Sequence, residues 1–142
     1  LWRFLLLKPD RVMLIDNQLL DRVTEEAKAS PRLRMNYNFH TSLDAKAQRL
    51  LNALEPGTIV PIHRHKTNGE TNILLRGKLR MLIYNDRKEL VESVLLDPLV
   101  GRYGIHIEPG QWHTLEVLES GSVILEVKDG PYQPIAPEDI LE

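Results

Sequence analysis

Residues 57–70 read GTIVPIHRHKTNGE and carry the most informative pattern in the chain. Two histidines, His63 and His65, stand two positions apart at the end of a short apolar run. Alternate residues of a β-strand point to the same face, so a strand here would present both imidazoles side by side. Glu70 follows after four intervening residues and would add an anionic oxygen. The pattern predicts a metal site, to which two half-exposed surface histidines are the alternative.

A third imidazole is expected from the segment PGQWH, which places His113 at the start of another strand. Three imidazole nitrogens and one carboxylate suit a borderline divalent ion, so the expected cofactor is one ion of Fe, Mn, Co, Ni, Zn or Cu per chain. Four protein ligands on an octahedral ion leave two adjacent positions open, whereas a structural site is normally closed. We therefore expect the ion to take water or a chelating small molecule and to polarise its carbonyl or hydroxyl oxygens.

Beyond residue 47 the chain consists of short apolar runs separated by Gly, Pro, Asn and Asp. Short strands at this spacing indicate an all-β sandwich or barrel. We assign residues 47–142 to this barrel and expect its last residues to form an extended strap, because prolines recur there. The expected strands cover residues 49–54, 59–62, 72–75, 79–84, 91–96, 113–118 and 122–127.

Residues 1–46 are expected to form an arm, a helix and a loop that pack on the barrel. The arm covers residues 1–14 and is extended and apolar. The helix begins after the N-cap residue Asp16 and ends at Ser30, and residues 32–46 form an irregular polar loop. Apolar residues that recur at helical spacing predict one buried face, formed by Leu19, Leu20, Val23 and Ala27.

The order of glycines and ligands resembles the first motif of the cupin superfamily, with Gly57, His63, His65, Glu70 and Gly77 at its five positions. Pro109-Gly110 followed by His113 resembles the second motif. The resemblance implies a jelly-roll barrel, or double-stranded β-helix, whose interior holds a metal through His63, His65, Glu70 and His113. The second motif departs in two ways: its proline and glycine are adjacent, and Val117 stands where the family usually has an asparagine.

Residues 30–40, 48–57 and 128–132 are similar to the WbuC-type cupin-fold metalloproteins. Members of that group are associated with bacterial surface-polysaccharide gene clusters. The resemblance implies a metal-dependent enzyme that isomerises or epimerises a small carbohydrate or nucleotide sugar. Two alternatives stay open, an Fe(II)-dependent cupin dioxygenase and a non-catalytic module that binds a small molecule at its metal.

Several polar residues outside the metal set are candidates for the chemistry. His40 and Tyr103 are the predicted catalytic acid or base, and His40 would line the pocket from the loop before the barrel. His106 stands between two isoleucines, so strand alternation predicts that it faces solvent. The expected substrate-binding residues are Asn38, Arg49, Asn52 and Trp112, for which strand surface or core packing is the alternative role.

Composition excludes several classes of partner. The chain has 142 residues and a net charge of −2, which leaves no basic surface for nucleic acid. It has no cysteine and therefore no disulfide, thiol nucleophile or iron–sulfur cluster. No stretch approaches a membrane span of about 20 apolar residues. Residues 1–7 lack the basic lead and the cleavage site of a signal peptide, so we expect a cytoplasmic protein. The apolar side chains of the same residues would be unfavourable in water, so we also expect a homodimer.

Overall fold

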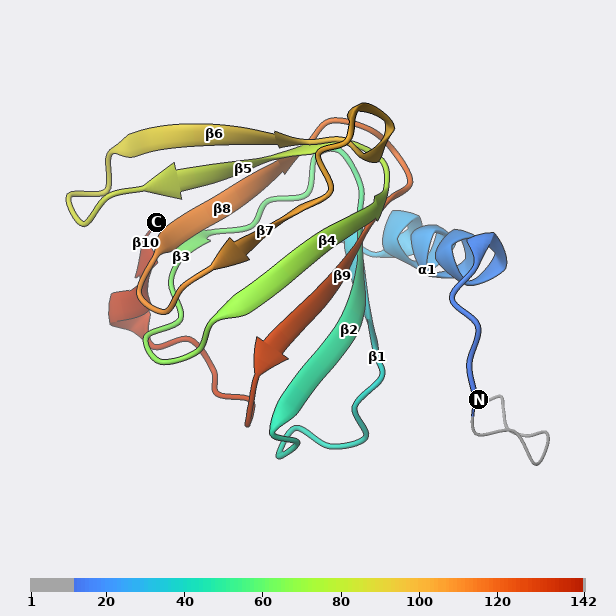
Figure 1. Ribbon diagram of the computed structural model, residues 1–142, viewed down its shortest axis with the longest axis horizontal. Helices are drawn as coiled ribbons and strands as arrows, with labels where there is room; N and C mark the ends of the chain where they lie inside the picture. The colour runs from blue at the N-terminus through green and yellow to red at the C-terminus, as the bar shows by residue number, and fades with distance from the viewer. Residues whose placement is uncertain (1–11, 142) are drawn as a thin grey trace.

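A computed structural model describes residues 12–141 and contains two five-stranded antiparallel sheets and one α-helix (Figure 1). This all-β arrangement confirms the predicted jelly roll. The helical elements are α1 (Asn17–Ala29), η1 (Pro98–Val100) and η2 (Pro137–Asp139). The strands are β1 (Arg34–Asn38), β2 (Ala47–Leu54), β3 (Ile62–His63), β4 (Glu70–Arg76), β5 (Leu79–Tyr84), β6 (Leu90–Leu96), β7 (Gly104–Ile107), β8 (Trp112–Val117), β9 (Ser122–Asp129) and β10 (Ile140–Leu141).

The two sheets are built from strands that lie far apart in the sequence. Sheet A has the order β1-β2-β9-β4-β7, and sheet B has the order β10-β3-β8-β5-β6. The chain crosses from sheet A to sheet B and back several times, so each sheet holds strands from both halves of the chain. In Figure 1 the two sheets face each other, and the metal-ligand motifs lie on strands of both sheets.

Helix α1 covers the outer face of sheet A and confirms the predicted helix. The Asp16 carboxylate accepts a hydrogen bond from the Leu19 amide at 3.1 Å, which caps the first turn. The helix packs on β1, β2 and β9 through one apolar face. Its buried apolar residues are Leu19, Leu20, Val23 and Ala27, as expected, and they meet Leu51, Ala53 and Val123 of the sheet.

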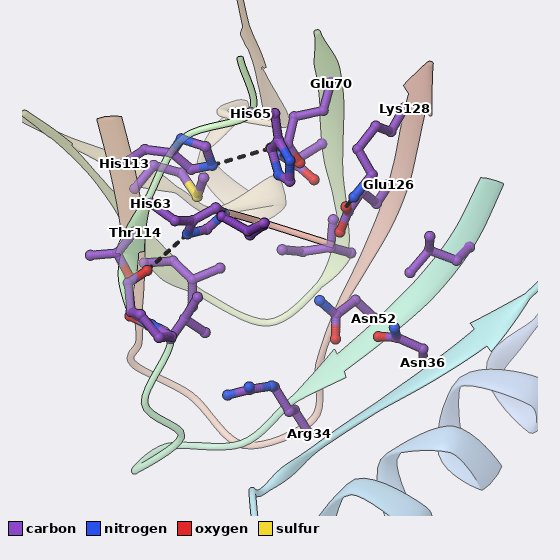
Figure 2. Close-up of a pocket in the computed structure, with 18 of the residues that line it drawn as sticks. Arg34, Asn36, Asn52, His63, His65, Glu70, His113, Thr114, Glu126 and Lys128 are labelled. Atoms are coloured by element: carbon purple, nitrogen blue, oxygen red, sulfur yellow. Dashed lines mark hydrogen bonds and ion pairs between the residues drawn. The ribbon is translucent and has the colours of Figure 1, made fainter. Parts of the chain in front are cut away.

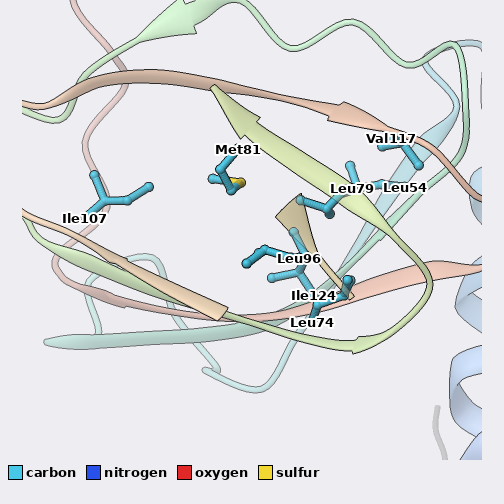
Figure 3. Close-up of a cluster of buried hydrophobic side chains, with 8 residues drawn as sticks. All are labelled: Leu54, Leu74, Leu79, Met81, Leu96, Ile107, Val117 and Ile124. Atoms are coloured by element: carbon cyan, nitrogen blue, oxygen red, sulfur yellow. The ribbon is translucent and has the colours of Figure 1, made fainter. Parts of the chain in front are cut away.

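An apolar cluster fills one part of the interior between the sheets (Figure 3). We call this cluster the apolar end; its buried members are Leu54, Leu74, Leu79, Met81, Leu96, Ile107, Val117 and Ile124. These side chains come from both sheets and are at most 7% exposed, so they form the contact that holds the sheets together.

Three segments differ from the sequence-based expectation. Residues 34–38, predicted as loop, form β1, which pairs with β2. The strap ends in the short strand β10, which pairs with β3. Strand β3 itself covers only two residues, because Pro61 has no amide to donate and Ile59 is exposed. Most of the predicted N-terminal arm lies outside the described residues.

No helix in residues 12–141 is long and apolar enough to cross a membrane.

Candidate metal centre

The four predicted metal ligands face one cavity between the sheets (Figure 2). His63 on β3 lies directly opposite His113 on β8, with ring centroids 4.5 Å apart. The His65 ring lies 5.2 Å from His63 and 6.2 Å from His113. Glu70 enters from the start of β4 in the facing sheet. Ligand atoms of His63, Glu70 and His113 all lie within 4.8 Å of one another, so these residues can hold one metal ion.

Backbone carbonyls fix the orientation of two imidazoles. The Nδ1 atom of His63 lies 2.8 Å from the Pro61 carbonyl oxygen, and the Nδ1 atom of His113 lies 2.8 Å from the Gln111 carbonyl oxygen. A carbonyl only accepts, so each Nδ1 carries the hydrogen and donates it. Each neutral ring then has a free lone pair on Nε2. This is the arrangement that metal-ligating histidines usually adopt.

The surroundings of the Glu70 carboxylate show whether a cation fits this site. Its Oε1 atom lies 3.1 Å from Nε2 of His113 and 3.4 Å from Nε2 of His65. This buried oxygen accepts no well-directed hydrogen bond from the described residues. An anionic oxygen and the lone pair of a neutral imidazole repel each other at this distance, unless a proton or a metal ion lies between them. The donor set therefore fits a divalent cation.

Burial and mutual charge shift the pKa values of the ligands. Burial is the main cause that lowers the pKa of His63 from 6.5 to about 4, and it also lowers the pKa of His65. Burial alone would raise the pKa of Glu70, but the contact with His113 and the nearby imidazole charges lower it to about 2. Burial alone would lower the pKa of His113, but the same contact with Glu70 raises it. Glu70 is thus ionised and His63 neutral at pH 7, as metal binding requires.

The cavity has a volume of about 360 Å³ and a polar lining beyond the metal ligands. A volume of this size lies at the lower end of the range for small-molecule sites. The strap contributes Tyr132 and Ile135 to its wall. Polar lining residues that sequence analysis missed are Arg32, Arg34, Asn36, Asn72, Thr114, Glu126 and Lys128.

Glu126 and Lys128 were missed because no motif in the sequence singles them out. The alternation of Val123, Leu125 and Val127 predicts a core stripe, and it leaves open which face of the strand borders a polar cavity. Val123 and Leu125 pack in the cluster beneath α1, and Val127 is 38% exposed. Ile124, Glu126 and Lys128 lie on the opposite face and line the cavity. The register with β4 places Glu70 opposite Lys128, and this pairing to a ligand strand is the signal that would have revealed them.

Glu126 and Lys128 form an ion pair beside the metal ligands. The Lys128 ammonium nitrogen lies 3.3 Å from Glu126 Oε2, and the two side chains are 18% and 14% exposed. Burial raises the pKa of Glu126, and the negative charge of Glu70 raises it further. A carboxyl group with a raised pKa in a cavity has the properties of a general acid or base.

Of the four predicted substrate-binding residues, only Asn52 lines the cavity. Arg49 lies three residues before Asn52 on β2, so alternation points it to the outer face. Asn38 is exposed at the end of β1, and its place in the cavity is taken by Asn36. Trp112 is buried on the outer side of β8, where the Arg64 guanidinium lies 4.7 Å from its ring centroid.

Neither predicted catalytic residue reaches the cavity. Tyr103 is 60% exposed and precedes β7, and it does not line the cavity. His40 is buried, but its Nδ1 contacts the Arg49 backbone at the side of sheet A instead of closing over the cavity. The loop that was expected to carry it inward begins with β1, which fixes the chain to β2. His106 faces outward, as alternation predicted, and contacts Thr71 and Glu108.

Comparison with solved structures agrees with the geometry. The chain is similar to the capsular polysaccharide assembling protein CapF from Staphylococcus aureus, with 17% identity and a TM-score of 0.61 over 74% of this chain and 30% of CapF. It is similar to KdgF from Halomonas sp., with 13% identity and a TM-score of 0.57 over 73% and 83% of the two chains. A cupin domain of Schizosaccharomyces pombe Cnp3 matches with 8% identity and a TM-score of 0.54, over 68% of this chain and 64% of that chain.

These likenesses show that the fold is that of the cupins. The chain spans less than two thirds of the Cnp3 and CapF chains that it matches. No curated protein matches the sequence. A family model described as "Domain of unknown function (DUF6016)" matches residues 15–96, and the chain belongs to this family.

Proposed function

We propose that this protein is a metal-dependent cupin enzyme that isomerises or epimerises a small carbohydrate. The observation that carries the proposal is the cavity in which three imidazoles and Glu70 stand beside the Glu126–Lys128 pair. We propose surface-polysaccharide metabolism in the bacterial cytoplasm as the setting, on the basis of the sequence motifs that resemble WbuC-type cupins. CapF, a capsular polysaccharide assembling protein by its printed name, supports the same setting.

The residues divide the chemistry between two groups. His63, His65, Glu70 and His113 would hold one divalent ion, which when bound supplies a Lewis acid for a carbonyl and a neighbouring hydroxyl oxygen. Glu126 lies on the adjacent strand β9 and is the cavity group placed to move a proton. Its carboxylate would remove the proton from the hydroxyl-bearing carbon beside the carbonyl and return it on the same face to the former carbonyl carbon, while the hydroxyl proton moves to the former carbonyl oxygen. Epimerisation would need a second proton donor on the opposite face. Lys128 stabilises the ionised form of Glu126 through the 3.3 Å contact.

Exchange of substrate protons with solvent tests whether the metal ligands and Glu126 have these separate roles. Metal-loaded protein is incubated in D₂O with a panel of ketoses, uronates and sugar phosphates, and proton NMR follows deuterium entering the carbon beside the carbonyl. We expect exchange with at least one member, and a loss of about 100- to 10,000-fold in Glu126→Gln with unchanged metal content. Glu116→Gln is the matched control, because Glu116 is a 60% exposed glutamate on β8 that pairs with Arg80.

Two other outcomes would contradict the proposal. Oxygen consumption by the iron-loaded protein, without solvent exchange, would identify a dioxygenase that uses the same four ligands. Binding of a sugar without exchange or oxygen uptake would identify a non-catalytic module.

We also propose that two copies associate through the apolar N-terminal segment. Residues 12–15 are apolar, and their exposed fractions lie between 43% and 87%. Covering such surface is favourable by about 25 cal/mol per Å². Sedimentation at micromolar concentration should show a dimer that Leu14→Asp weakens, and a monomer throughout would contradict this proposal.

A further inference from the structure

A second polar cluster lines the cavity on the strands that carry no metal ligand. It consists of Arg34 and Asn36 on β1 and Asn52 on β2, and we call it the amide–arginine patch (Figure 2). The register places Asn36 directly opposite Asn52, so the two carboxamides share the inner face of sheet A. The Asn52 Oδ1 atom is buried and has no hydrogen-bond partner among the described residues.

The buried, unpaired carboxamide oxygen of Asn52 points to a ligand, and the exposed Asn36 stands opposite it. A buried polar group without a partner is destabilising, so such groups are usually paired with protein, water or a ligand. The two asparagines therefore have donors and acceptors to offer to a bound molecule.

Arg34 is anchored on one side and free on the other. Its Nη1 atom donates to the Ile59 carbonyl oxygen at 2.7 Å and to Thr58 Oγ1 at 3.4 Å. Within residues 12–141, its Nε and Nη2 atoms make no hydrogen bond. The anchored guanidinium thus keeps two donors of its planar fork for an oxyanion, and the contact with the backbone holds that fork in place.

The charges around the patch are not balanced by the protein. Arg32 and Arg34 both line the cavity, and neither forms an ion pair with a described acidic residue. Burial lowers the pKa of Arg34, and the positive charge of Arg32 lowers it further, which is the sign of a cation that lacks an anionic neighbour. The third cation of the lining, Lys128, is already paired with Glu126.

The patch is separated from the metal ligands by the width of the sheet. The strand order β4-β9-β2-β1 puts three strand spacings, about 14 Å, between β4 and β1. The register also sets Arg34, which pairs at the level of Ser122, six residues or about 20 Å along the strands from Glu70, which pairs with Lys128. Side chains extend into the cavity from both sides and shorten this span. Both groups line one cavity of about 360 Å³, so a small molecule that fills it has its metal-binding oxygens at one end and a second group at the other.

We propose that the substrate carries an oxyanion at the end remote from the metal, held by Arg34 with the amides of Asn36 and Asn52. The substrate class is then a sugar acid or a sugar phosphate, and a neutral sugar is the poorer ligand. This inference rests on the proposed function for the metal end of the substrate, and it adds the identity of the other end.

Matched ligands test the proposal. Calorimetric titration of the metal-loaded protein compares D-glucuronate, D-glucose 6-phosphate and D-glucose, which share one sugar ring. We expect at least one anionic sugar to bind about tenfold or more tightly than glucose, since a hydrogen-bonded charge contributes about 1.5–3 kcal/mol. A preference for glucuronate assigns a carboxylate, and a preference for glucose 6-phosphate assigns a phosphate.

Substitutions show which residue is responsible for the preference for an anionic sugar over glucose. Arg34→Gln should remove the preference for the anion, and Arg49→Gln should keep it, because Arg49 is the arginine on the outer face of the neighbouring strand. Asn36→Asp retains the anchor from Arg34 to Ile59 and should also abolish anion binding through repulsion. It keeps the test decisive if Arg34→Gln does not fold.

The metal content of the protein distinguishes a failure of the proposed oxyanion site from a failure of the proposed metal-dependent function. A protein that binds metal but takes all three sugars equally, takes none of them, or keeps its preference in Arg34→Gln and Asn36→Asp would overturn the proposed oxyanion site and leave the metal centre intact. A protein that binds no metal would contradict the proposed function instead. Loss of the preference in these variants, with unchanged metal content, supports the oxyanion site.

Discussion

The interior of the barrel has two ends that differ in what they contribute. The apolar end is closely packed, whereas the cavity end holds ionisable and amide groups that lack partners. The same strands supply both: β8 carries Val117 into the apolar end and His113 into the cavity, and β9 does the same with Ile124 and Glu126. The apolar end supplies the burial that stabilises the fold, and the cavity end keeps groups that only a ligand can satisfy. Stability and chemistry are thus separated along each strand.

The largest effect is expected from removing a metal ligand. His63→Ala should lower the affinity for a divalent ion by about 100-fold or more, because structural four-ligand sites bind metal with about 10–16 kcal/mol in total. The fold should persist, since the apolar end does not involve His63. Metal titration gives the affinity and circular dichroism the fold. Equal metal affinity in the variant would show that His63 is no ligand.

A substitution that removes packing in the apolar end should lower stability and leave metal affinity unchanged, which is the reverse of the result expected for His63→Ala. Leu54 is fully buried, so Leu54→Ala should lower the free energy of unfolding by about 2–5 kcal/mol. The folded variant should still bind one metal ion with unchanged affinity, because Leu54 lines no part of the cavity. Urea denaturation and metal titration measure the two quantities. A large loss of metal affinity in the folded variant would contradict the separation of the two ends.

Metal affinity should depend on pH through His113. Its pKa is raised in the metal-free protein, so a bound proton competes with the metal at neutral pH, whereas His63, with a pKa of about 4, is already neutral. Affinity should therefore rise with pH, by at most about tenfold per unit, until His113 is deprotonated. Proton release during titration in two buffers measures this. A pH-independent affinity between pH 6 and 8 would disagree with the Glu70–His113 contact.

The smallest effect is expected outside the interior. Asp16→Ala removes the cap of α1 and should lower the free energy of unfolding by about 1 kcal/mol without any change in metal affinity. Glu26→Ala, at an exposed position of the same helix, is the control and should leave stability unchanged within about 0.5 kcal/mol. Thermal denaturation of both variants makes the comparison. A loss of several kcal/mol in Asp16→Ala would give α1 a larger role than its position implies.

The sequence predicted the parts of the fold that local patterns determine. The helix followed from its cap and its apolar face, and the strand from Leu79 to Tyr84 followed from alternation with turn residues at both ends. Strand β1 was missed although it alternates: Met35 and Tyr37 pack beneath α1, while Asn36 faces the cavity. Its polar residues and short length resemble those of a loop.

The candidate site was predictable only where ligand spacing is local. His63, His65 and Glu70 lie within eight residues, so their proximity follows from one strand and one loop. Glu126 and Arg34 join the cavity through strand pairing between distant segments, which no spacing in the chain reports. The catalytic roles given to His40 and Tyr103 relied on residue type and loop position, and neither property determines which way a side chain points.

Anomalous diffraction from a crystal grown with a divalent transition metal tests the central claim most directly. The account predicts one strong peak per chain inside the barrel, within ligand distance of His63, His65, Glu70 and His113. A peak elsewhere, or none at a concentration that saturates the protein in solution, would contradict the metal centre and with it the proposed reaction.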